Sequence, residues 1–187
     1  DFYGQDYVRD GSNNITNGGI YGLNNNFATG AHLSGKILAP NFNGFLITYD
    51  EILFYLAEAA ARGASLGKTA SELYADAITA SFIYWTGSST GVTDYLTARP
   101  YVDIKSVAKE SWIAMYMRGL VGWTTYRRID GAFTLVVPDG NTPNLTVIPT
   151  RFFYPINEQT LNKANWSAAA SAMGGDKLTS KIFWDKN

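Results

Sequence analysis

Few side chains in this sequence could carry out chemistry. There is no cysteine and one histidine, His32, so thiolate metal sites, disulfides and cysteine nucleophiles are excluded. Paired carboxylates remain, because glycoside hydrolysis needs two carboxyl groups at a fixed separation. The available carboxylates, which no sequence spacing marks as a pair, include Glu58, Asp94, Asp130 and Glu158. We therefore expect no catalytic residues, no cofactor and no enzyme activity.

Aromatic residues point to recognition instead. They make up 14% of the 187 residues, and tyrosine is the commonest of them. Residues 1–44 contain eight glycines and eight asparagines, with aromatic residues interleaved. A pyranose ring offers apolar C–H faces that stack on aromatic rings and hydroxyl groups that pair with amides. We expect Tyr7, Tyr21 and Phe27 to bind a sugar ligand from these loops; the alternative is that such rings only pin the loops to a helical core.

Ions and nucleic acids are poorer candidates for the ligand. Residues 10–14 (Asp-Gly-Ser-Asn-Asn) place oxygen atoms close together, but they lack the alternating ligand spacing and the closing glutamate of an EF-hand loop. The net charge is −1, so the chain has no basic field that would attract a phosphate backbone. We expect neither a metal site nor a nucleic-acid partner.

A helix over residues 47–63 is the strongest predicted element. Thr48 and Glu51 have the spacing of a capping box, and Ile47 and Ile52 have that of a hydrophobic staple. Periodicity predicts an apolar face opposite a polar one. The apolar face would hold Ile52, Leu53, Leu56, Ala59 and Ala60, and the polar face Glu51, Tyr55, Glu58 and Arg62. The spacing of Glu58 and Arg62 favours an ion pair within the helix.

Further helices follow along the chain. Thr69 and Glu72 form a second predicted capping box, which begins a helix through residue 85. The short connection between the first two helices predicts an antiparallel, tetratricopeptide-like pair. A third helix is expected over residues 103–117, with Gly119 and Gly122 breaking or kinking it. Arg127 and Arg128 then follow, beside aromatic residues, as either a stacking and ion-pair cluster or an anion site.

The last third of the sequence has a different character. Residues 133–137 are typical of a strand, and residues 148–155 should be extended because they contain two prolines. Asn157 is expected to cap a short helix, and residues 168–172 to add a turn or two. We predict a mainly α fold of tetratricopeptide-like helix pairs with long irregular loops and a few short strands. Residues 1–45 would form a loop-rich part of the ligand-binding region, and residues 46–187 a helical region.

Several motifs, in order, carry a family resemblance. Residues 46–63 have a Tyr-x-Glu start, an Ala-Glu-Ala centre and an Arg-Gly end, and residues 111–115 read Ser-Trp-Ile-Ala-Met. Residues 119–130 contain Trp-x-x-Tyr-Arg-Arg, and residues 149–155 read Pro-x-Arg-Phe-Phe-Tyr-Pro. Asn-Lys-Ala-Asn-Trp at 162–166 and Phe-Trp-Asp at 183–185 complete the set. Together they resemble the C-terminal part of SusD/RagB-type outer-membrane nutrient-binding lipoproteins.

This resemblance implies a non-catalytic protein that captures oligosaccharides or other nutrients at the cell surface, as in polysaccharide utilisation. It implies a SusC-like TonB-dependent transporter as the partner and the outer membrane as the location. Attachment to the membrane would come only through a lipid anchor upstream of Asp1, since no apolar run approaches the ~20 residues of a membrane span. Two alternatives stay open: a helical-repeat adaptor that binds protein, and a glycoside hydrolase.

Overall fold

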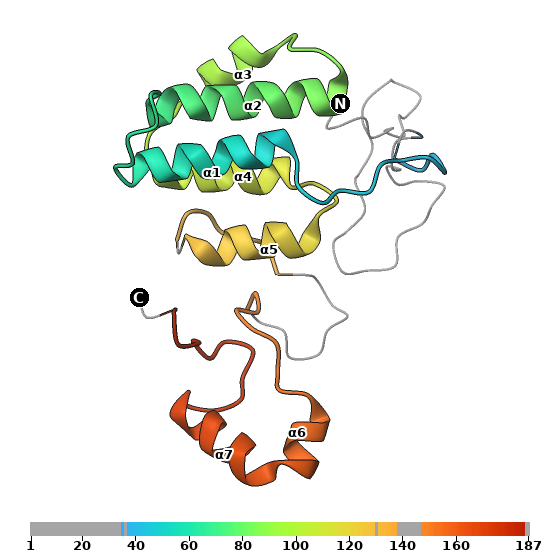
Figure 1. Cartoon of the computed structure of the whole chain (residues 1–187), viewed down its shortest axis with the longest axis vertical. Helices are drawn as coiled ribbons and strands as arrows, with labels where there is room; N and C mark the ends of the chain where they lie inside the picture. Colours follow the sequence, from blue (N-terminus) through green and yellow to red (C-terminus); the bar gives the residue numbers. More distant parts are fainter. Residues whose placement is uncertain (1–34, 36, 130, 138–146, 186–187) are drawn as a thin grey trace. The chain divides into compact units, whose positions relative to one another are not determined.

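The computed structural model describes residues 35, 37–129, 131–137 and 147–185, and the regular structure in these ranges is helical. The chain divides into two compact units, one holding α1 to α5 and one holding α6 and α7. The helices are α1 (Tyr49–Ala61), α2 (Ala70–Thr86), α3 (Val92–Ala98), α4 (Ile104–Ala114), α5 (Gly119–Arg128), α6 (Ile156–Leu161) and α7 (Lys163–Ala172) (Figure 1).

Helices α1 and α2 form the antiparallel pair that the sequence predicts (Figure 1). Ala57 on α1 and Ala77 on α2 are fully buried, so the two backbones can approach closely. The largest buried side chains of the unit, Phe54 and Tyr74, come from the same two helices. Helix α4 packs against both α1 and α2, and α5 packs against α4. The predicted mainly α, tetratricopeptide-like fold is therefore confirmed.

Helix α2 begins as its local sequence predicts. Thr69 Oγ1 accepts a hydrogen bond from the Glu72 N–H at 3.2 Å, and Glu72 Oε2 accepts one from the Thr69 N–H at 2.7 Å. Both bonds of the capping box are therefore present, and Gly87 ends the helix in the left-handed conformation at φ 77°. The predicted buried face is also confirmed, with Leu73, Ala77, Ile78, Ser81 and Trp85 inside.

The start of α1 differs from the prediction. Thr48 is the N-cap residue, but its side chain makes no capping hydrogen bond. Glu51 is directed elsewhere: it accepts hydrogen bonds from Arg118 Nη1 at 2.7 Å and from the Tyr55 hydroxyl at 2.8 Å. Ile47 is 68% exposed and Ile52 40% exposed, so they form no buried staple. The capping box and staple predicted here are wrong, although the helix itself is in place.

The buried face of α1 also differs from the predicted one. Leu53 is buried as expected, but Ile52 is not, and acidic residues from the predicted solvent face are buried. The physical reason is that arginines from α5 and its N-cap reach these carboxylates and neutralise them, which makes their burial tolerable. The buried residues of α1 are Asp50, Glu51, Leu53, Phe54, Ala57 and Glu58.

The chain reverses between α4 and α5. Asp103 caps α4 by accepting from the N–H groups of Lys105 at 2.8 Å and Ser106 at 3.2 Å. The helix ends at residue 114, three residues before the predicted end at 117. Met117 takes a left-handed conformation at φ 64°, and α5 begins two residues later at Gly119. Gly122 lies inside α5 and does not break it.

In the second unit, the extended residues before α6 form no β-ladder. Residues 133–137 also lack strand structure, so no predicted strand is seen in the described residues, where no second strand offers a partner. Helix α6 begins after Pro155 rather than at an Asn157 cap. Helix α7 spans ten residues and is longer than the turn or two predicted. The predicted boundary between residues 45 and 46 stays a prediction, because residues 1–34 lie outside the described part.

An ion pair takes the place of an apolar core in this second unit. Arg151 Nη1 lies 2.9 Å from Asp176 Oδ1, and both side chains are at most 8% exposed. Asp176 also accepts from the Trp166 indole N–H at 3.0 Å and from the Tyr154 backbone N–H at 3.3 Å. The Arg151 guanidinium lies over the Tyr154 ring at 4.9 Å. We call Arg151, Tyr154, Trp166 and Asp176 the acidic clasp.

Candidate functional site

The residues predicted to bind a sugar, Tyr7, Tyr21 and Phe27, lie outside the described residues, and that prediction stays a prediction. His32 and Asp130 lie outside them as well. Helix α1 holds Glu58, which binds Arg62 at 3.1 Å, as predicted, and Arg128 at 2.7 Å. This candidate carboxylate is therefore engaged in ion pairs within the fold.

Buried arginines link α1 to the α5 region. Arg118, the N-cap of α5, is 9% exposed and binds Glu51 at 2.7 Å and Asp50 at 3.8 Å. Arg128 at the end of α5 binds Glu58. Each guanidinium is matched by carboxylates of α1, so these groups fasten helices together. We call Asp50, Glu51, Glu58, Arg118 and Arg128 the arginine cluster.

The two arginines at the end of α5 stack on aromatic rings. Arg127 lies 4.4 Å from the centroid of the Trp123 ring, and Arg128 lies 4.9 Å from that of the Tyr55 ring. Burial, and then the hydrogen bond to Glu51, raise the pKa of Tyr55 above its ordinary value, so the phenol stays protonated at neutral pH. Of the two predicted alternatives, the stacking and ion-pair cluster describes these arginines better than an anion site.

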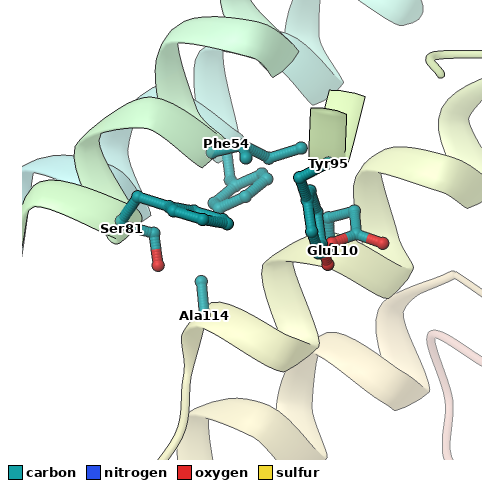
Figure 2. A pocket seen from close by; sticks show the side chains of 7 residues that line it. Phe54, Ser81, Tyr95, Glu110 and Ala114 are labelled. Atoms are coloured by element: carbon teal, nitrogen blue, oxygen red, sulfur yellow. Dashed lines mark hydrogen bonds between the residues drawn. The ribbon is translucent and has the colours of Figure 1, made fainter. Parts of the chain in front are cut away.

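A small pocket lies within the α1–α5 unit (Figure 2). Tyr95 and Glu110 lie side by side in it, and the Tyr95 hydroxyl donates to Glu110 Oε2 at 2.6 Å (Figure 2). The pocket encloses about 190 Å³ including its open mouth, below the ~300 Å³ at which small-molecule sites begin. It is too small for a sugar. Its lining consists of Phe54, Ile78, Ser81, Phe82, Tyr95, Glu110 and Ala114.

A second feature is a row of aromatic rings between the segment before α1 and the end of α2. The Phe45 ring lies 5.6 Å from Phe42, 5.6 Å from Tyr84 and 5.9 Å from Trp85. Trp85 in turn lies 5.5 Å from Tyr116. These separations are typical of favourable aromatic pairs. We call Phe42, Phe45, Tyr84, Trp85 and Tyr116 the aromatic ledge.

The ledge is anchored from inside and open at one end. The Arg118 guanidinium lies 5.2 Å from the Phe45 ring centroid. Trp85 is 8% exposed, whereas Tyr84 is 42% exposed. Burial raises the pKa of Tyr84 above its ordinary value, so the phenol is uncharged at neutral pH. Sequence periodicity placed Trp85 on the apolar stripe of α2 but could not show that residues 42–45 pack on it, because that contact is tertiary.

Other kinds of site are not found in the described part of the chain. It holds no group of three or more His, Cys, Asp or Glu residues placed to bind a metal ion. None of the helices described is long and apolar enough to cross a membrane.

Comparison with known proteins identifies the fold. A protein-family model described as "Starch-binding associating with outer membrane" matches residues 2–155. A SusD-like protein from Bacteroidetes superposes with a TM-score of 0.69 at 25% identity, over 84% of this chain and 33% of that one. A SusD homologue from Bacteroides vulgatus superposes with a TM-score of 0.76 at 19% identity, over 99% of this chain and 46% of that one. Among curated proteins, no sequence matches this chain.

A third neighbour carries a ligand in its name. The chitin-binding SusD homologue from Flavobacterium johnsoniae superposes with a TM-score of 0.67 at 21% identity, over 86% of this chain and 40% of that one. The chain thus spans between a third and a half of the length of these three solved structures. Identities below 25% show the fold alone. The family match covers most of the sequence and agrees with the helical structure, so the chain belongs to the SusD-like family.

Proposed function

We propose that this protein captures oligosaccharides at the outer surface of the outer membrane and passes them to a SusC-like TonB-dependent transporter, without cleaving them. The observation that carries the proposal is the family match over residues 2–155, whose description joins starch binding to the outer membrane. The chitin-binding neighbour, which shares the fold, is consistent with a glycan as the ligand. A starch-like or chitin-like polymer is therefore the first ligand class to try.

The chemistry of the described acidic residues supports binding rather than hydrolysis. Glu51 and Glu58 are held by arginines, and Glu110 by Tyr95 and by Arg99 at 3.5 Å. A general acid in a glycosidase must be able to release a proton to the leaving oxygen, and its partner must face the same bond. Carboxylates committed to ion pairs within a helical scaffold are poorly suited to that role.

The experiment is a binding and cleavage assay on the full chain. The protein is incubated with soluble starch, chitin oligosaccharides and a panel of other polysaccharides, and both retention and new reducing ends are measured. We expect retention of at least one glycan and no new reducing ends. New reducing ends would overturn the proposal in favour of a hydrolase. Retention of none would overturn it in favour of the helical-repeat adaptor.

Tyr7, Tyr21 and Phe27 remain the proposed ligand residues. Replacing all three with alanine should weaken glycan retention, because each substitution removes a ring available for stacking. An unchanged affinity would remove these residues from the proposal while leaving the function itself intact.

A further inference from the structure

The aromatic ledge is the described surface whose chemistry best matches a ligand. Tyr84 is 42% exposed at the end of α2, and Phe42 is partly exposed in the segment before α1. Each lies 5.6 Å from the ring of Phe45, so one bridging ring holds both in a fixed relation. Two rings placed in this way can stack on separate units of one sugar chain.

Amide side chains flank the rings. Asn41 and Asn43 are both exposed and stand on either side of Phe42. An asparagine amide can donate to one hydroxyl and accept from another, which suits the hydroxyl groups at the rim of a sugar ring. Rings interleaved with amides therefore provide both the apolar and the polar half of sugar recognition.

The charge of the ledge favours a neutral ligand. Its nearest cation, Arg118, lies against the Phe45 ring but is already bound to Glu51 and Asp50. The Tyr84 phenol is protonated at neutral pH because burial raises its pKa. A surface of neutral rings and amides offers little to an anionic or cationic partner.

The ledge is also rigidly supported. Trp85 lies beneath it at 8% exposure, 5.2 Å from the Tyr84 ring and 5.9 Å from the Phe45 ring. Ile37, at 8% exposure, anchors the beginning of the segment that carries Phe42. Rings that are fixed before binding lose little conformational entropy when a ligand stacks on them.

We propose that the aromatic ledge is a glycan-stacking surface for a neutral pyranose chain, with Tyr84 and Phe42 as the stacking rings and Asn41 and Asn43 as hydroxyl partners. It would act in addition to Tyr7, Tyr21 and Phe27. The inference rests on the proposed function and assigns a second surface to it.

The test compares single substitutions in the full chain. Affinities for soluble starch and chitin oligosaccharides are measured by calorimetry and by tryptophan fluorescence, which Trp85 can report because it touches the ledge. Tyr84→Ala and Phe42→Ala should each weaken binding about fivefold, the loss of one stacked ring. Tyr84→Phe, which keeps the ring, should bind within twofold of the unsubstituted chain. Tyr49→Ala, at a tyrosine that is 73% exposed on α1, is the matched control and should change nothing.

The outcomes separate this inference from the proposed function. Full-strength binding by Tyr84→Ala and Phe42→Ala, with unchanged circular dichroism, would overturn the ledge and leave glycan capture standing. Equal losses in Tyr84→Ala and Tyr84→Phe would also overturn it, because stacking would then not be the cause. If the unsubstituted chain retains no glycan, the proposed function fails and the ledge fails with it.

Discussion

The two compact units of this chain are held together by different forces. The α1–α5 unit buries a continuous set of apolar side chains, including Phe54 and Tyr74 at 1% exposure each. In the α6–α7 unit the buried residues, among those described, are Arg151, Ala170 and Ser180. Apolar burial depends weakly on pH and salt, whereas a charged, hydrogen-bonded centre depends on the protonation of its acid. The two units should therefore respond to different perturbations.

The largest effect should come from opening the core of the α1–α5 unit. Phe54→Ala should lower its free energy of unfolding by about 3–5 kcal/mol, because a fully buried ring is lost and a cavity remains. Urea denaturation followed by circular dichroism measures the change. The control is Ile52→Ala on the same helix, at a side chain 40% exposed, where we expect less than about 1 kcal/mol. Equal losses at the two positions would show that α1 is not packed as described.

The arginine cluster tests whether this unit also depends on charge. Arg118→Met should cost about 3 kcal/mol, because it leaves Glu51 and Asp50 buried without their cation. Arg62→Met removes a guanidinium that is 56% exposed and should cost under about 0.5 kcal/mol. Denaturation midpoints of the two variants decide between them. A small loss for Arg118→Met would mean that apolar packing alone holds α5.

The acidic clasp should make the second unit sensitive to acid. Burial acts to raise the pKa of Asp176, but the Trp166 and Tyr154 hydrogen bonds and the Arg151 charge outweigh it and hold the pKa below its usual range. A lowered folded pKa means that this stabilisation is complete above the ordinary pKa of about 4 and is lost as pH falls through the folded value.

We therefore expect the NMR signal of the Trp166 indole N–H to shift and broaden below about pH 4, when its acceptor is protonated. Asp176→Asn should show the loosened signal already at pH 7 and should lower the stability of this unit by about 2 kcal/mol. Asp94→Asn, at an exposed aspartate on α3, should leave the signal unchanged. A Trp166 signal that is constant from pH 7 to pH 3 would contradict the clasp.

The smallest effect should separate two threonines that look alike in sequence. Thr69→Ala should cost about 1 kcal/mol, because it removes a formed cap, whereas Thr48→Ala should cost close to nothing. The Thr48 hydroxyl is buried without a hydrogen-bond partner, so its removal leaves no group newly unsatisfied. Thermal denaturation of both variants measures the difference. A cost at Thr48 equal to that at Thr69 would contradict the observed α1 N-terminus.

These two threonines also show how far the sequence reaches. At Thr69 both partners of the box are local, and the predicted bonds form. At Thr48 the partner, Glu51, is taken by Arg118 from the distant end of the unit, a competition that local spacing cannot reveal. The buried face of α1 was misjudged for the same reason. Helix positions and the tetratricopeptide-like pair were predictable because periodicity and capping are local properties.

The candidate site was predictable only in kind. Aromatic rings among asparagines indicated sugar chemistry, and Phe42 and Asn43 belong to that same composition. Their neighbours in the ledge, Tyr84 and Tyr116, come from elsewhere in the chain and are joined to them only by folding. The second unit's clasp was equally hidden, because Arg151 and Asp176 are separated by a turn and two helices whose geometry sets their contact.

The Arg118–Glu51 bond has a kinetic consequence. It joins residues 67 positions apart, so forming it closes a long loop, whereas the α1–α2 pair needs only a short connection. The pair should assemble early and the arginine should find its carboxylates late, after the folding barrier has been crossed. A contact made on the native side of the barrier acts mainly as a latch on the unfolding rate. In stopped-flow experiments, Arg118→Met should therefore steepen the loss of native protein while leaving the refolding rate nearly unchanged.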